Sequence, residues 1–209
     1  MKKDKFNKFS VSLGLLDYIN PIFYTITIIM IIKNMNLESP FNTIMIVGAI
    51  LSILFGFIIP TGKVIVGIGI IKFKMPVSLV FLVNTGIFLS GLMLFKDVMN
   101  LKLVLLLIIG VTMLLLLTFI YMKSKKINTI AVLTGAFGYL LIYTSLIFLS
   151  IRKSNLSSII FYAIAIILFV MLCGIGINEN LKDPKIHWKI EILNVICQGL
   201  VVLGTIILF

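Results

Sequence analysis

The chain has 209 residues, of which 61% are hydrophobic, and its formal net charge is +11. Its mean hydropathy of +1.23 excludes a water-soluble fold, because soluble domains contain only about half apolar residues. The positive charge does not indicate a nucleic-acid partner, since the Lys and Arg residues form short clusters between apolar runs, as membrane orientation requires.

Seven apolar runs are long enough to cross a bilayer as helices, which takes about 20 mostly apolar residues each. A transmembrane barrel would need strands of alternating polarity, and these runs do not alternate. We therefore predict an all-α polytopic transmembrane bundle of about seven spanning helices, with residues 1–209 forming a single transmembrane domain. The predicted spans are 13–33, 42–60, 76–95, 102–122, 128–150, 158–178 and 189–209.

The basic residues are distributed unequally between the two sides of these spans. Placing the N-terminus in the cytoplasm puts thirteen of the 18 basic residues inside and five outside, which predicts a cytoplasmic N-terminus and an external C-terminus in the cell membrane. The inner group is Lys2, Lys3, Lys5, Lys8, Lys63, Lys72, Lys74, Lys123, Lys125, Lys126, Lys182, Lys185 and Lys189. The outer group is Lys33, Lys96, Lys102, Arg152 and Lys153.

The first span carries polar side chains on one face. Asp17, Asn20, Tyr24 and Thr27 follow one another at spacings of three, four and three, which places them within a narrow arc of a helix. In the preceding segment, 6–16, apolar residues recur at helical spacing with lysines between them. This pattern fits a short helix on anionic headgroups, and a disordered tail is the alternative.

The second and third spans carry small residues four positions apart. Gly48, Ser52 and Gly56 lie on the second span, and Gly86 and Ser90 repeat the spacing on the third. Small residues allow helix backbones to approach closely. We therefore predict that these two helices are central in the bundle.

The segment after the second span is apolar but short. Pro60-Thr61-Gly62-Lys63 is followed by Val64–Ile71, eight apolar residues that lie between lysines. Such a run is too short to span and too apolar for an exposed loop. It is either a kinked extension of the second helix or a re-entrant or interfacial piece on the cytoplasmic side.

The last span carries the longest polar stripe. His187, Glu191, Asn194 and Gln198 are separated by four, three and four residues, and Thr205 continues the series. An ionised group at the centre of a membrane helix costs roughly 2.5–3.5 kcal/mol on insertion scales. The stripe is therefore predicted to face other helices or a wet cavity.

Helical rise places several polar residues of different spans at one depth. At about 1.5 Å per residue, Tyr24, Asn84 and Gln198 lie at similar distances from the cytoplasmic surface, and Lys63 stands at the same end as Asp17. These positions predict a cavity that faces the cytoplasm. The candidate substrate-binding residues are Asp17, Asn20, Tyr24, Lys63, Asn84, His187, Glu191, Asn194 and Gln198.

A structural interpretation of the same residues remains open. Polar side chains in membrane bundles often only link helices by hydrogen bonds, and His187 beside Trp188 is also typical of a headgroup-level anchor. Tyr139 and Tyr143, four apart on the fifth span, are interpreted as packing residues.

The small number of histidines and cysteines excludes several kinds of metal and redox site. One histidine and two cysteines within apolar runs cannot provide a bis-histidine haem site, a histidine-rich zinc site or a CxxC redox pair. Phosphate-binding and nucleophile-elbow motifs are absent from the sequence. We therefore expect no cofactor and no metal, and we assign no catalytic residue.

Three functions fit these patterns. The first is a transporter or channel-like protein whose cavity binds a small polar or charged solute, with Asp17 and Glu191 carrying charge or a coupling proton. The second is a membrane-embedded enzyme acting on a lipid headgroup at the cytoplasmic leaflet, with His187 and Glu191 as its acid–base pair and Lys63 holding an anionic headgroup.

The third is a non-catalytic membrane subunit that contacts a partner chain through the face formed by Gly48, Ser52 and Gly56. The expected partners are membrane lipid and a small polar solute, without nucleic acid. An oligomer is compatible with the sequence.

Overall fold

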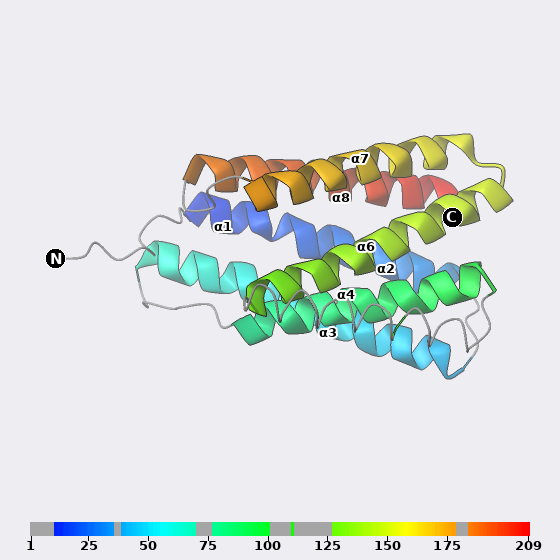
Figure 1. The fold of residues 1–209 in the computed structure, drawn as a ribbon, viewed down its shortest axis with the longest axis horizontal. Coiled ribbons are helices and arrows are strands. Elements are labelled where there is room, and N and C mark those ends of the chain that lie inside the picture. The colour runs from blue at the N-terminus through cyan, green and yellow to red at the C-terminus, as the bar shows by residue number, and fades with distance from the viewer. Residues whose placement is uncertain (1–10, 36–38, 70–76, 101–109, 111–126, 179–183) are drawn as a thin grey trace.

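The computed structural model describes residues 11–35, 39–69, 77–100, 110, 127–178 and 184–209. The regular structure in these ranges is helical (Figure 1). The helices are α1 (Val11–Asp17), α2 (Ile19–Asn34), α3 (Phe41–Ile68), α4 (Val77–Val98), α6 (Ile127–Arg152), α7 (Leu156–Asn178) and α8 (Pro184–Leu208). Only Tyr18 separates α1 from α2, and together they form one span.

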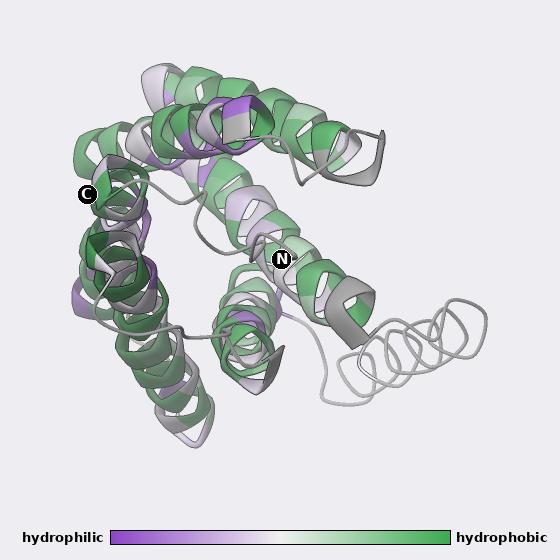
Figure 2. Ribbon diagram, turned by 90° about the vertical axis from the view of Figure 1, so that its left-hand side faces the viewer, coloured by the Kyte–Doolittle hydropathy of each residue, from purple (hydrophilic) through white to green (hydrophobic). Residues whose placement is uncertain are grey.

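Within the described ranges, six helical segments are long and apolar enough to cross a membrane, not the seven that the sequence predicts. The predicted span 102–122 lies outside the described residues except for Gly110. The six are Val11–Asn34, Phe41–Ile68, Ser78–Val98, Ile130–Arg152, Leu156–Ile175 and Lys185–Leu208. Figure 2 shows hydrophobic residues over most of each helix, as a hydrocarbon solvent requires. The chain is a polytopic membrane protein.

The helices of the described part pack in a closed ring. In order around the ring, α2 contacts α3, α3 contacts α4, α4 contacts α6, α6 contacts α7, α7 contacts α8, and α8 contacts α2. Helices α1, α4, α6 and α8 begin at the same end of the bundle (Figure 1). We call this the Lys63 end, and we call the opposite end, where α6 ends, the Arg152 end.

Close backbone contact between α3, α4 and α6 confirms that the small residues are packing positions. A Cβ atom on Gly48 would lie 2.8 Å from the carbonyl oxygen of Gly86, and one on Gly86 would lie 2.5 Å from Ser52 Oγ. On α6, a Cβ atom on Gly138 would lie 2.6 Å from the backbone nitrogen of Phe88. Any larger side chain at these positions would separate the helices.

Helix α3 continues past Pro60 to Ile68 and ends at Gly69, whose φ of +83° is left-handed. The extension alternative is therefore correct as far as Ile68, and residues 70–76 lie outside the described ranges. The extension covers α1, because Leu13 is 2% exposed and a Cβ atom on Gly14 would lie 2.8 Å from Val64 Cγ2. Residues 11–17 thus form a helix that packs on α3, and residues 1–10 are not described.

Candidate functional site

Three charged side chains from three helices meet at the Lys63 end. Lys63 Nζ on α3 lies 2.6 Å from Asp17 Oδ2 on α1 and 3.2 Å from Glu191 Oε1 on α8. The side chains are only 19%, 13% and 11% exposed, respectively. Because little water screens these charges, their attraction is stronger than that of a surface ion pair. With both carboxylates ionised, the three groups carry a formal charge of −1.

Asn20 completes this ion network. Its Nδ2 donates to Asp17 Oδ1 at 3.4 Å and to Glu191 Oε2 at 3.2 Å. Both neighbours accept only, so the amide nitrogen is the atom that must face them. As a result Asn20 Oδ1 is buried without a hydrogen-bond partner. The network of Asp17, Asn20, Lys63 and Glu191 therefore retains one unused acceptor.

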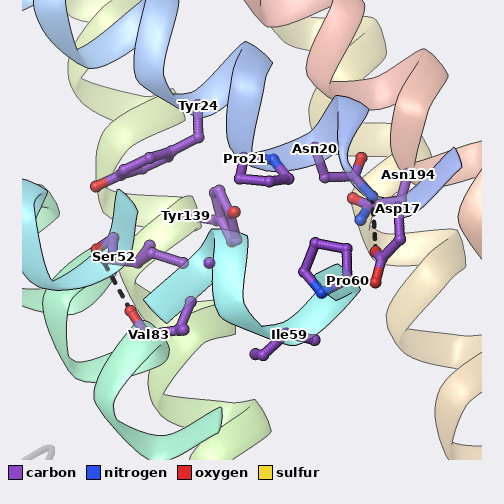
Figure 3. A pocket seen from close by; sticks show the side chains of 12 residues that line it. Asp17, Asn20, Pro21, Tyr24, Ser52, Ile59, Pro60, Val83, Tyr139 and Asn194 are labelled. Carbon is purple, nitrogen blue, oxygen red and sulfur yellow. Dashed lines mark hydrogen bonds between the residues drawn. The ribbon is translucent and has the colours of Figure 1, made fainter. Parts of the chain in front are cut away.

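A cavity of about 130 Å³ adjoins the network. It has room for several waters or for a small solute. Its walls come from five spans, and Figure 3 shows Asp17 and Asn20 beside Asn194 at one side and Tyr24 and Tyr139 at the other. The lining residues are Asp17, Asn20, Pro21, Tyr24, Ser52, Gly56, Ile59, Pro60, Val83, Ile87, Tyr139 and Asn194.

Aromatic rings form the wall opposite the network. The rings of Tyr24 and Tyr139 are 6.3 Å apart and nearly perpendicular, at 88°. Tyr139 also packs against Tyr143 at 5.7 Å and Phe169 at 5.8 Å. Edge-to-face contacts of this kind hold rings in fixed orientations. The position of Tyr139 is therefore set by several neighbours.

Two prolines change the backbone chemistry of the cavity wall. Pro21 and Pro60 both line the cavity, and proline lacks the N–H that a helix uses to bond the carbonyl four residues earlier. The carbonyls of Asp17 and Gly56 therefore lack their usual helical donors. Both of these residues also line the cavity.

Six of the nine predicted site residues come together. Asp17, Asn20, Lys63 and Glu191 form the network, while Tyr24 and Asn194 line the cavity. The prediction that the polar stripe of the last span faces inward is confirmed, because Glu191 is 8% exposed, Gln198 2% and Thr205 0%.

The other three predicted residues lie outside the described cavity lining. Asn84 packs against α6, where a Cβ atom on Gly135 would overlap its Oδ1 atom. Gln198 donates to the hydroxyl of Tyr143 at 3.1 Å, so it links α8 to α6. His187 is half-buried on α8, one turn before Glu191. For Asn84 and Gln198 the structural interpretation is the better one.

Sequence reasoning missed Tyr139 as a cavity residue. It was interpreted as packing alone, yet it both packs and lines the cavity. The prolines were available as a signal, since Pro21 lies inside the polar stripe of the first span.

Comparison with protein-family models, curated protein sequences and solved structures found no match for this chain.

Proposed function

We propose that this protein is a transporter or channel-like protein of the cell membrane that binds a small polar or charged solute in the cavity. The observation that carries the proposal is the position of Asp17, Lys63 and Glu191, three poorly exposed charges, beside a cavity bounded by five spans. Charged side chains inside membrane bundles are costly, and they commonly mark solute or proton pathways.

We further propose that the Lys63 end faces the cytoplasm. The helix ends at this side adjoin the sequence segments that carry most of the lysines, and basic residues are enriched in cytoplasmic loops. In this orientation the network stands at the cytoplasmic side of the cavity. Helix α8 ends at the opposite, external side (Figure 1).

The two carboxylates allow a cation from the cavity to replace Lys63 as their binding partner. Lys63 neutralises only one of the two charges of Asp17 and Glu191. A positively charged solute or a proton that reaches the cavity competes with Lys63 for the same oxygen atoms. Asp17 or Glu191 then carries the charge or the coupling proton, while Asn20, Tyr24 and Asn194 contact the solute.

The test is solute flux in proteoliposomes. Currents on a supported membrane would be recorded with small organic cations, inorganic cations, organic anions and neutral solutes driven by a proton gradient. We expect the Asp17→Asn, Glu191→Gln double variant to lose the flux of the wild type. The matched control is Asp97→Asn, the same chemical change near the end of α4 and outside the cavity lining. Wild-type flux from the double variant would refute the proposal.

The lipid-headgroup enzyme stays a prediction. Both carboxylate oxygens of Glu191 are engaged by Lys63 and Asn20, an arrangement that favours charge exchange over an acid–base pair with His187. Lipid turnover by the purified protein, lost in His187→Ala, is the observation that would favour the enzyme.

The packing of the small residues argues against the contact face suggested for a partner subunit. Gly48 and Ser52 are buried because α4 covers them, and a Cβ atom on Gly56 would touch Pro21 at 3.4 Å. The small residues hold this chain together and do not present a free surface. A partner subunit would have to contact a different face.

A further inference from the structure

We propose that the solute of the cavity is a small protonated amine. This inference rests on the transport function proposed above and names its substrate class. Two independent features of the cavity carry it, an excess of negative charge and acceptor atoms on one side and aromatic rings on the other.

The charge of the network selects a cation. Lys63 contacts both Asp17 and Glu191, so its single positive charge is already shared between two carboxylates. With both carboxylates ionised, an anion in the adjoining cavity would meet the remaining negative charge, whereas a cation would neutralise it. Lys63 also shows that the carboxylates accept an ammonium group, which is the head group that we assign to the solute.

The hydrogen-bonding groups of the wall select a cation that carries N–H donors. Asn20 Oδ1 is buried and unused, and Pro60 leaves the carbonyl of Gly56 without its helical donor. The hydroxyl of Ser52 already donates to the carbonyl of Gly48 at 2.8 Å. Asn20 Oδ1 and the Tyr24 hydroxyl oxygen, both buried without a hydrogen-bond partner in the described structure, are acceptors that a protonated amine satisfies and that a quaternary ammonium ion cannot.

The aromatic rings favour an organic cation over an inorganic one. Tyr24 and Tyr139 line the cavity and meet edge to face, and the face of an aromatic ring attracts an ammonium ion by about 0.5–2 kcal/mol. Rings also pack against the alkyl part of an amine, for which a hydrated metal ion has no counterpart. A cavity of about 130 Å³ suits a small amine better than a large one.

The experiment is a binding measurement on the purified full chain in detergent. Methylammonium and ethylammonium chloride would be titrated by calorimetry and by the rise in melting temperature that a bound ligand causes. Potassium chloride, tetramethylammonium chloride and sodium acetate serve as comparison probes. We expect saturable binding of the two amines, weakened about tenfold or more by Asp17→Asn and by Tyr139→Leu.

Two further variants separate recognition from folding. Tyr139→Phe keeps the ring and should bind the amines nearly as the wild type does. Phe81→Leu removes an exposed ring, 42% accessible and outside the cavity lining, and should change nothing. If Tyr139→Leu is misfolded, Tyr139→Phe together with Asp17→Asn still decides the matter, because the former must keep amine binding and the latter must weaken it about tenfold or more.

The outcomes separate this inference from the transport function. Binding of potassium as tight as that of methylammonium and unaffected by Tyr139→Leu, or saturable binding of acetate, would overturn the amine assignment. Flux of a neutral or anionic solute without amine binding would overturn it as well and leave transport standing. Amine binding that depends on Asp17 but without flux of any solute would support the site and overturn transport.

Discussion

Gln198 on α8 donates a hydrogen bond of 3.1 Å to the hydroxyl of Tyr143 on α6. The two side chains are 2% and 1% exposed, and they join helices that lie on either side of α7 in the ring. The bond therefore links α6 directly to α8, the two neighbours of α7 in the ring. It is a link between helices at the depth where a solute contact was predicted.

Removing either partner of this bond should destabilise the protein slightly. Hydrogen bonds between membrane helices contribute about 0.6 kcal/mol on average and at most about 1.7 kcal/mol. We expect Tyr143→Phe and Gln198→Leu each to lower the free energy of unfolding within that range, measured by denaturation in mixed micelles. Because they remove the same bond, the double variant should lose less than the sum of the two. Strict additivity would show that the bond does not form.

Removing Lys63 should be much more damaging. Lys63→Met leaves Asp17 and Glu191 facing each other without their counter-ion, and breaking a buried ion pair costs about 3–5 kcal/mol. The melting temperature in detergent should fall clearly. Adding Asp17→Asn should restore part of the loss, because one of the uncompensated charges disappears. Lys33→Met, the same change at an exposed position, should have little effect, and an equal fall in that control would argue against the network.

The contact between α3 and α4 predicts an unfavourable effect of a small substitution. Gly86→Ala would place a methyl group 2.8 Å from the backbone nitrogen of Ser52, and overpacking costs about 1–3 kcal/mol. In an open helix the same change is favourable by about 1 kcal/mol. The control is Gly174→Ala on α7, where a Cβ atom meets nothing within 4 Å. We expect a lower melting temperature for Gly86→Ala only, and similar values for both would contradict this packing.

Thiol labelling tests the proposed orientation. Single cysteines at Arg152 and Lys185, both exposed and at opposite ends of the bundle, would be introduced after Cys173 and Cys197 are changed to serine. An impermeant maleimide should label Arg152→Cys on intact cells and Lys185→Cys only after permeabilisation. The reverse pattern would place the network outside.

The network could be predicted from sequence because its members lie near helix ends on one side. Spacings of three and four residues identify the polar faces of the first and last spans. Asp17, Lys63 and Glu191 lie at the same end of the bundle. Burial of the stripe followed from the cost of exposing charge to lipid. These arguments need only helix geometry and solvation.

The middle of the cavity could not be predicted in the same way. Rise per residue gives the depth of a side chain, but the direction in which it points around the ring depends on its neighbours. Tyr24, Asn84 and Gln198 were placed at one depth, yet only Tyr24 lines the cavity, while Asn84 packs on Gly135 and Gln198 bonds Tyr143. Tyr139 was missed for the same reason.

Asn20 and Glu191 are 171 positions apart in the chain, yet they share a hydrogen bond. Synthesis proceeds from the N-terminus, so Asp17 and Lys63 are both present long before α8 leaves the ribosome. Asp17 on the first span and Lys63 on the second can therefore form their ion pair before Glu191 is synthesised. The ring then closes when α8 is inserted. This step places Glu191 beside Lys63, which is already in position.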